Sequence, residues 1–253
     1  MSPSLRVPDG YRVIAFDEID STNLEAARQA AQGAADGAVI WAKAQTGGRG
    51  RRGRAWASPV GNLYCSILMR PSEPAQTATQ IGFVVSLAGA DAVRSVLSED
   101  RIVALKWPND ILVSGRKVAG ILLESQSSAP GRLDWLVAGF GLNVASHPIG
   151  LEYPASDLHA EGAPRAVTAK DMLEAYLSAF ARWRARWRSE GFAPMRTAWA
   201  GLAVGLGRDI KVRLTDETLE GRFRELDGDG GLVLEMADGS LRVITSGQIF
   251  AIG

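Results

Sequence analysis

A loop rich in glycine and arginine is the stretch of this sequence best suited to chemistry. Residues 45–56, which we call the Arg/Gly loop, read QTGGRGRRGRAW, with four glycines and four arginines directly after an apolar run. Glycine lets backbone N–H groups approach a ligand closely, and guanidinium groups form bidentate hydrogen bonds with phosphate or carboxylate oxygens. The sequence therefore predicts an anion site, and a phosphate ester suits both kinds of donor.

The charge around the Arg/Gly loop is one-sided, although the chain as a whole is neutral. Six basic residues and no acidic residue lie between positions 37 and 72, whereas the whole chain holds 28 basic and 28 acidic residues. A protein with a general nucleic-acid surface usually carries a net positive charge. The pattern therefore favours a small anionic ligand over nucleic acid.

Three glycines of the loop, Gly48, Gly50 and Gly53, also match the G-x-G-x-x-G pattern of dinucleotide-binding folds. That pattern requires a helix to begin at the glycines. Here the sequence WASP at 56–59 and a strand-like run at 63–69 follow instead, which predicts a loop between strands. No Walker A sequence occurs either, so a nucleotide would be held by a different device.

The composition is that of an ordinary globular protein. With 253 residues and 46% hydrophobic content, the chain is long enough for one large domain and a small second one. The single Cys65 excludes a disulfide within the chain, and only two histidines argue against a structural zinc site. No secretory signal is visible, and the most apolar run, 81–90, is about half the roughly 20 residues that a transmembrane helix needs. A cytoplasmic protein with no metal site of its own is expected.

A helix is predicted to begin near Thr22, just before the Arg/Gly loop. Thr22 with Glu25 three positions later fits a capping box. Under that interpretation Ser21, Thr22 and Asn23 only start the helix. Apolar spacing predicts the other elements of this half as strands at 11–16, 37–44 and 62–69 and a core-facing helix at 77–97.

Polar residues interrupt an apolar strand predicted at 102–113. Pro108, within the sequence KWPND, removes a ladder donor and favours a β-bulge, which often re-aims side chains at a site. The alternative is a plain Asn-Asp turn with Lys106 in solvent. Lys117 begins the next predicted strand, 117–124.

Two further features have competing interpretations. Gly139 and Gly141, in a strand predicted at 133–144, admit a ligand or serve only for close packing. A long helix is predicted from a capped start at Thr168, and its arginines favour a solvated face over a nucleic-acid stripe. These arginines are Arg182, Arg184, Arg186 and Arg188.

The pattern of predicted elements changes beyond Gly207, where short strands alternate with Asp-Gly turns. These turns are typical of β-hairpins, so a small β-barrel is predicted at 205–253, after a first domain at 1–204. The predicted strands are 210–214, 219–226, 231–236 and 241–245.

Taken together, these motifs resemble the biotin–protein ligase family (biotin–acetyl-CoA-carboxylase ligases) over nearly the full length of the chain. Each motif alone is weak evidence, but five of them in the family's order are specific. The matching blocks are DSTN at 20–23, the Arg/Gly loop, LKWPND at 105–110, GRKVAGI at 115–121 and GFGLNV at 139–144.

The resemblance implies an α/β (α+β) fold, with a mixed-sheet catalytic domain like that of class II synthetases and a C-terminal SH3-like β-barrel. It also implies two reactions. The biotin carboxylate attacks the α-phosphorus of ATP to give biotinyl-5′-AMP and pyrophosphate, and a lysine amine of a biotin carboxyl carrier domain then attacks this mixed anhydride. ATP and biotin are the substrates, Mg²⁺ accompanies ATP, and no protein nucleophile is required because catalysis consists of positioning and charge neutralisation.

The resemblance also implies the site residues. Catalytic charges would come from Lys117, Arg49 and Arg51. The biotin-binding set would be Ser21, Thr22, Asn23, Gln45, Gly48, Arg49, Gly50, Arg51, Lys117, Gly120 and Gly139. The ATP-binding set would be Arg49, Arg51, Arg52, Arg54, Trp56, Lys106, Asn109, Asp110, Lys117 and Asn143. Trp56 and Asn143 would contact adenine, and Lys106, Asn109 and Asp110 would line the junction with the incoming lysine.

Repressor members of the family carry a winged helix-turn-helix domain before the catalytic domain, whereas about ten residues precede the first predicted strand here. A monofunctional ligase without a DNA or membrane partner, as a monomer or a homodimer, is therefore expected. One alternative is a lipoate or octanoate–protein ligase of the same fold, against which the Arg/Gly loop argues. The other is a module that binds a ligand or nucleic acid without turnover.

Overall fold

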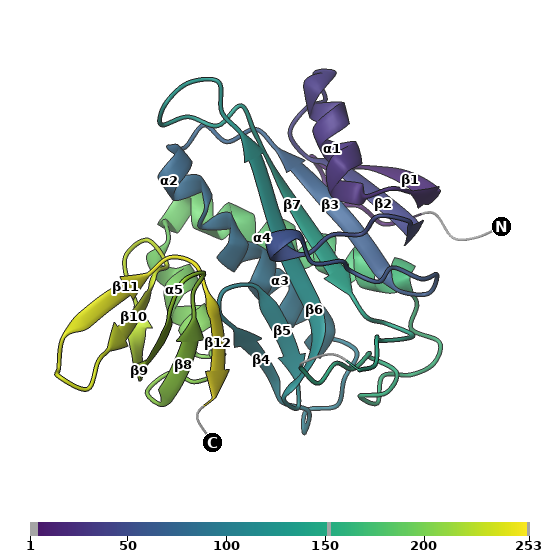
Figure 1. Ribbon diagram of the computed structural model, residues 1–253. Helices are drawn as coiled ribbons and strands as arrows, with labels where there is room; N and C mark the ends of the chain where they lie inside the picture. The colour runs from purple at the N-terminus through teal and green to yellow at the C-terminus, as the bar shows by residue number, and fades with distance from the viewer. Residues whose placement is uncertain (1–4, 151–152, 252–253) are drawn as a thin grey trace.

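Two β-sheets organise the residues that this computed structural model describes, 5–150 and 153–251 (Figure 1). The large sheet has the strand order β1-β2-β3-β7-β6-β5-β4, in which β1 and β2 are parallel and all other neighbours are antiparallel. This mixed sheet confirms the expected fold class. Its strands are β1 (Arg12–Ile19), β2 (Ala38–Gln45), β3 (Leu63–Met69), β4 (Val103–Lys106), β5 (Asp110–Val113), β6 (Arg116–Gln126) and β7 (Trp135–Leu142).

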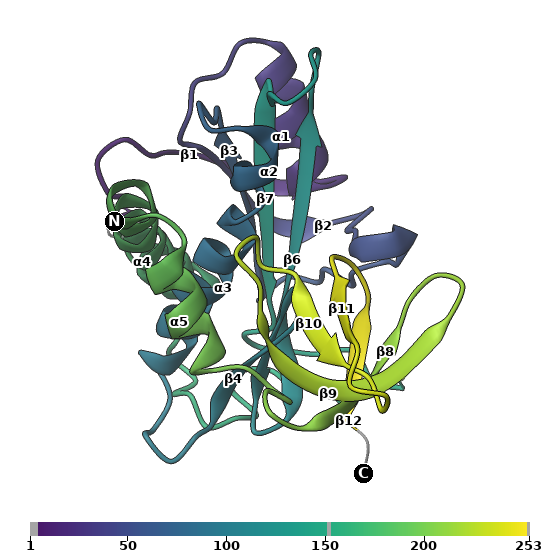
Figure 2. The same cartoon turned by 90° about the vertical axis from the view of Figure 1, so that its left-hand side faces the viewer.

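Helices cover the two faces of the large sheet unequally. Helices α3 and α4 lie side by side on one face, α3 over β4 to β7 and α4 over β3, whereas α1 packs on the other face against β2, β3 and β7 (Figures 1 and 2). The helices are α1 (Thr22–Ala31), α2 (Ala75–Ala78), α3 (Ile81–Arg94), α4 (Ala169–Glu190) and α5 (Ala193–Ala200), with a 3-10 turn, η1 (Arg51–Gly53), in the Arg/Gly loop.

Because side chains alternate along the central strands, the two faces of the large sheet carry different kinds of residue. Cys65 and Ile67 of β3 and Phe140 of β7 belong to the core that α3 and α4 cover. Their neighbours Ser66 and Gly139 point to the opposite face, because successive side chains of a strand alternate. Polar and small residues of the same two strands are therefore available on the face that carries α1.

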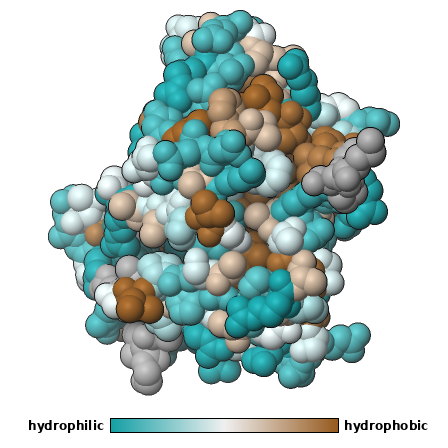
Figure 3. Space-filling view, turned by 90° about the vertical axis from the view of Figure 1, so that its right-hand side faces the viewer, coloured by the Kyte–Doolittle hydropathy of each residue, from teal (hydrophilic) through white to brown (hydrophobic). Residues whose placement is uncertain are grey.

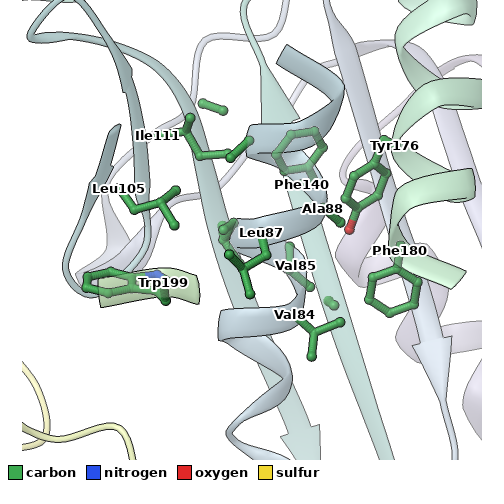
Figure 4. Close-up of a cluster of buried hydrophobic side chains, with 14 of the residues drawn as sticks. Val84, Val85, Leu87, Ala88, Leu105, Ile111, Phe140, Tyr176, Phe180 and Trp199 are labelled. Carbon is green, nitrogen blue, oxygen red and sulfur yellow. The ribbon is translucent and has the colours of Figure 1, made fainter. Parts of the chain in front are cut away.

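The main core lies between the large sheet, α3 and α4 (Figure 4). Helix α3 contributes an almost continuous apolar surface, including the fully buried Val84, Val85 and Ala88. Phe140 of β7 stacks on Tyr176 of α4, with ring centroids 4.4 Å apart. This packing fixes the position of β7, and with it the opposite face of the sheet.

Helix α4 begins as predicted, but one of its arginines does not lie in solvent. Thr168 and Asp171 form the expected capping box. Arg184, however, is 6% exposed and donates to both carboxylate oxygens of Asp36 at 2.9 and 2.6 Å. Burial opposes the charge on Arg184, but the hydrogen bonds to Asp36 raise its pKa above the ordinary value. The prediction of a fully solvated arginine face is wrong at this position.

Residues 102–113 form a hairpin rather than one bulged strand. Strands β4 and β5 pair antiparallel, with Lys106 opposite Asp110, and the residues between them make the turn. The bulge prediction is therefore wrong, and the turn was the correct alternative. Lys106 is nevertheless only half-buried rather than solvated, since its ammonium lies 4.4 Å from the centre of the Tyr153 ring.

The second sheet is antiparallel and packs against the first part of the chain (Figure 2). The Trp107 indole donates to the backbone oxygen of Gly230 at 3.3 Å, and Phe83 packs edge-on against Phe192 and Trp199 nearby. The four predicted strands are present, and a fifth, β12, was not predicted. The strands, in the order β11-β10-β9-β8-β12, are β8 (Asp209–Arg213), β9 (Thr218–Leu226), β10 (Leu232–Glu235), β11 (Leu241–Ile244) and β12 (Gln248–Ala251).

The surface is mixed in character. The face shown in Figure 3 is mostly hydrophilic and carries separate apolar patches rather than a continuous apolar band. Within 5–150 and 153–251, none of the helices is long and apolar enough to cross a membrane.

Gly89→Ala in α3 is expected to destabilise the protein by about 1–3 kcal/mol. The added methyl group would lie 2.6 Å from the Ile111 side chain and 2.8 Å from Phe140, and neither can move freely in the core. Gly82→Ala in the same helix is the matched control, since its methyl group would meet Leu123 at 3.4 Å and alanine favours helix by about 1 kcal/mol. Urea unfolding measures both, and equal stability would contradict the proposed close packing at Gly89.

Candidate active site

A cavity of about 840 Å³ lies between the Arg/Gly loop, the α1 side of the large sheet and the second sheet. All residues of the predicted catalytic, biotin and ATP sets line it. They are Ser21, Thr22, Asn23, Gln45, Gly48, Arg49, Gly50, Arg51, Arg52, Arg54, Trp56, Lys106, Asn109, Asp110, Lys117, Gly120, Gly139 and Asn143.

The Arg/Gly loop is a folded hairpin that crosses in front of β6 and β7 (Figure 1). Gly50 N–H donates to the backbone oxygen of Arg54 at 2.7 Å, and Trp56 N–H donates to that of Gly48 at 2.9 Å. A side chain at Gly48 would overlap the Trp56 backbone, so this position requires glycine. The chain beyond Trp56 forms no helix before β3, as the sequence predicts.

The arginines of the loop are held by partners on other elements. Arg49 pairs with Glu124 of β6 at 3.0 Å, and Arg54 donates to Gln248 of β12 at 3.2 Å. Arg51 donates to Asn109 at 3.4 Å and to the backbone oxygen of Gly247 at 3.5 Å. The loop is therefore tied to both sheets rather than held open by repulsion among its own charges.

Arg51 is the least solvated cation of this group. Burial and the neighbouring Arg52 charge lower the pKa of the Arg51 guanidinium below its ordinary value, while Asp110 acts in the opposite direction. An anion in the cavity would offset both unfavourable effects, because opposite charge favours the ionised form. The electrostatics therefore favour an anionic ligand beside Arg51.

Polar side chains from α1, β2 and the end of the loop form one wall of the cavity. Gln45 Oε1 accepts from Thr22 N–H at 2.8 Å, and Gln45 Nε2 donates to Ser58 Oγ at 2.8 Å. Ser21 is the N-cap of α1 but makes no side-chain cap bond. The capping box predicted for Thr22 and Glu25 is therefore wrong, and Thr22 faces the polar wall instead.

Glycines of β6 and β7 form the floor of the cavity. A side chain at Gly139 would overlap the Asn23 amide, and one at Gly141 would lie 2.8 Å from the Trp56 indole. Trp56 also lies above Gly120, where a Cβ would be 3.1 Å from the ring. These glycines thus let the Asn23 and Trp56 side chains pack on the bare sheet, which is the close-packing interpretation considered above, on a surface that lines the cavity.

Lys117 lines the cavity at the start of β6. Its ammonium forms a 2.6 Å ion pair with Asp110 and lies 5.3 Å from the centre of the Trp56 ring. Asp110 lies on β5 and Lys117 on β6, and the antiparallel pairing of these two strands places both side chains. A cation next to the loop arginines can hold two anionic groups together.

Asn143 and Lys106 mark the ends of the site. Asn143 is 2% exposed, and its Nδ2 atom donates to the backbone oxygen of Ser156 at 3.0 Å, so it also fixes the segment after β7. Lys106 lies close to two aromatic rings, those of Tyr153 and, at 5.5 Å, Phe250 of β12. Residues far apart in the chain therefore meet at this end of the cavity.

Three residues at or next to the cavity, Glu124, Ser66 and Gln248, were not predicted from the sequence. Glu124 shares the strand parity of Gly120, a predicted site residue, so alternation along β6 could have indicated it. Ser66 is the one polar residue in the apolar run of β3 that points to the α1 face. No local signal indicates Gln248, which reaches the site only through the packing of the second sheet.

Comparison with known proteins identifies the family. The Biotin/lipoate A/B protein ligase family matches residues 14–143, and the Biotin protein ligase C terminal domain matches residues 205–251. A biotin–[acetyl-CoA-carboxylase] ligase of Paracoccus denitrificans is 39% identical, over 91% of this chain and 97% of its own. A bifunctional ligase/repressor of Bacillus subtilis is 28% identical, over 94% of this chain and 73% of its own.

A solved structure agrees with these matches. The biotin protein ligase of Aquifex aeolicus, in complex with biotin and ATP, superposes with a TM-score of 0.79 at 28% identity, covering 94% of this chain and 97% of that one. The fold and the cavity define a ligase of the biotin/lipoate class. Within it, the chain belongs to the biotin protein ligases.

Gly139→Ala is expected to weaken biotin binding by about tenfold or more. The methyl group would displace Asn23, which accepts a hydrogen bond from Ser66, and an unmade bond to a buried polar group costs about 1–3 kcal/mol. Gly228→Ala is the control, because a Cβ there meets nothing within 4 Å. Titration calorimetry with biotin compares the two, and equal affinities would show that Asn23 does not shape the pocket.

Proposed function

We propose that this protein biotinylates a specific lysine of a biotin carboxyl carrier domain, with ATP as the second substrate and biotinyl-5′-AMP as the intermediate. The observation that carries the proposal is the arrangement of the cavity. Its lining combines a neutral polar wall on α1 and β2 (Thr22, Gln45) with cations on the Arg/Gly loop and β6 (Arg51, Lys117). This fits a ligand with a hydrogen-bonding ring and a carboxylate tail, next to a triphosphate.

The side chains take roles that follow from their placement. The polar wall would bind the ureido ring of biotin through the biotin set given above, and the loop arginines would bind its carboxylate and the ATP phosphates. Trp56, on the glycine floor, would contact adenine. Asp110, the only carboxylate among the described residues that line the cavity, is the protein group able to contact Mg²⁺ brought by the phosphates.

In the first reaction the biotin carboxylate is itself the nucleophile. It forms a bond to the α-phosphorus of ATP, and the bond from that phosphorus to the bridging oxygen breaks, so that pyrophosphate leaves with the electron pair. Lys117, Arg49 and Arg51 hold the two anions in contact and stabilise charge on the phosphoryl oxygens. Positioning and charge neutralisation are the contributions of the protein.

In the second reaction the neutral amine of the carrier lysine attacks the carbonyl carbon of the anhydride, and AMP leaves. Lys106, Asn109 and Asp110, at the turn between β4 and β5, would line the entry of that lysine. We further propose a catalytic domain at 1–204 and a C-terminal barrel at 205–253, a cytoplasmic location, no DNA partner, and either a monomer or a homodimer.

The lipoate or octanoate ligase is the rival enzyme, and a non-catalytic binding module is the rival of a different class. Neither a lipoyl nor an octanoyl group has a hydrogen-bonding ring that would use the donors and acceptors of Thr22, Asn23 and Gln45. ATP–pyrophosphate exchange that depends on added biotin, and not on lipoate, separates the three. Mass spectrometry of a purified carrier domain after incubation with enzyme, biotin and Mg-ATP then tests transfer, with one biotinyl increment expected.

Lys117→Ala is expected to abolish adenylate formation while the protein remains folded. The side chain is 25% exposed and supplies charge rather than core packing. Pyrophosphate exchange and circular dichroism are the measurements. Lys170→Ala is the control, because Lys170 lies on α4 among residues that do not line the cavity. Exchange near the wild-type rate in the Lys117 variant would contradict the assigned role.

Arg49→Gly and Arg51→Gly are each expected to release biotinyl-5′-AMP into solution. One lost charge-assisted hydrogen bond costs about 1.5–3 kcal/mol, enough to weaken retention of the adenylate roughly ten- to a hundredfold. A site that cannot hold the anhydride allows it to react with any amine it meets.

Serum albumin incubated with each variant, biotin and ATP should therefore become biotinylated. Arg182→Ala, on the solvent face of α4, is the control and should label only the carrier domain. Unlabelled albumin while adenylate is being made would show that the Arg/Gly loop is not the retaining element.

A further inference from the structure

Glu124 of β6 connects two residues that line the cavity and belong to different elements, Asn23 of α1 and Arg49 of the Arg/Gly loop. Its Oε2 atom accepts a hydrogen bond from Asn23 Nδ2 at 2.8 Å. Arg49 Nη2 donates to its two carboxylate oxygens at 3.0 and 3.1 Å. A single carboxylate thus contacts a residue of the proposed biotin set and an arginine of the Arg/Gly loop.

The Asn23 side of this connection is buried and fixed in orientation. Asn23 is 4% exposed and Ser66 is fully buried. Ser66 Oγ lies 2.6 Å from Asn23 Oδ1 and donates to it, because a carbonyl oxygen can only accept. Asn23 Nδ2 faces two acceptors, Glu124 and, at 3.3 Å, the backbone oxygen of Leu122. The amide therefore has one orientation, and it aims its donor at Glu124.

The Arg49 side leaves most of the guanidinium available to the cavity. Within the described residues, Glu124 is the only hydrogen-bond partner of the Arg49 side chain, and it uses Nη2 alone. A guanidinium carries five N–H donors in a rigid fork, so anchoring one nitrogen orients the others. Arg49 lines the cavity, and Glu124 therefore decides how its remaining donors meet an anion.

We propose that Glu124 is a positioning residue that makes the binding of biotin and ATP cooperative, an inference that rests on the function proposed above. Biotin bound next to Asn23 would further restrict the motion of the Asn23 side chain and, through their hydrogen bond, that of Glu124, which holds Arg49 in the orientation that receives phosphate. By thermodynamic reciprocity, ATP bound at Arg49 strengthens biotin binding by the same factor.

Glu124→Gln keeps the Asn23 contact and weakens the Arg49 contact. A glutamine carbonyl in the place of Oε2 still accepts from Asn23, whereas Arg49 loses the ion pair and the 3.0 Å hydrogen bond to Oε1 and keeps at most the 3.1 Å contact with a neutral oxygen. The measurement is the dissociation constant of biotin, by titration calorimetry, with and without an ATP analogue that has a methylene bridge between its α- and β-phosphates. In the wild type the analogue should tighten biotin binding about tenfold.

In the Glu124→Gln variant, biotin alone should bind within about twofold of the wild type, and the analogue should change its affinity by less than about twofold. Glu235→Gln is the matched control. Glu235 pairs with Arg224 of the second sheet, also at 3.0 Å, and its side chain is 29% exposed against 33% for Glu124. This variant should retain the wild-type coupling.

Persistence of the coupling in Glu124→Gln would overturn the inference, as would a wild type that makes biotinyl-5′-AMP but binds its two ligands independently. Either result would leave the proposed function intact. A wild type that makes no biotinyl-5′-AMP from biotin and ATP would instead overturn the proposed function. Loss of coupling in Glu124→Gln, with retention in Glu235→Gln, would support the positioning role.

Discussion

The alternation of side chains along β3 and β7 is the constraint on which the rest of the structure depends. One face of these strands presents large apolar residues such as Ile67 and Phe140 and must be covered by α3 and α4. The other face presents Gly139 to the cavity and Ser66 to the side chains of Thr22 and Asn23, which line it. Because both faces belong to the same strands, the packing of the core also fixes the position of the cavity floor.

Charge inside the cavity is compensated by the protein itself. Glu124 offsets Arg49, and Asp110 offsets Lys117. A substrate carboxylate or phosphate therefore meets cations that are already paired with carboxylates of the protein. It either replaces the protein carboxylate at the cation or binds beside it. Such an arrangement lowers the cost of keeping several cations close together, and it makes affinity depend on how readily those carboxylates share their partners.

Local signals in the sequence account for what could be predicted. Glycines and arginines between two apolar runs indicate an anion-binding loop between strands, and Thr168 with Asp171 indicates a helix start. Long-range contacts account for what could not. Arg184 has the spacing of a helix surface, yet its partner Asp36 is 148 positions away. Alternation along β6 could have indicated Glu124, but its pairing with Arg49, 75 positions away, is identified only once the loop has folded back over β6.

The contacts between the Arg/Gly loop and the second sheet have a consequence for synthesis of the chain. Arg51 and Arg54 find acceptors at Gly247 and Gln248, which lie 196 and 194 positions later in sequence. A ribosome exposes the N-terminal part first, and domains fold in that order. The large sheet can therefore form while the loop still lacks these two anchors. The Arg/Gly loop gains these two anchors only after residues beyond 246 have emerged, so retention of a reactive acylating intermediate by a newly made chain depends on residues far from the loop in sequence.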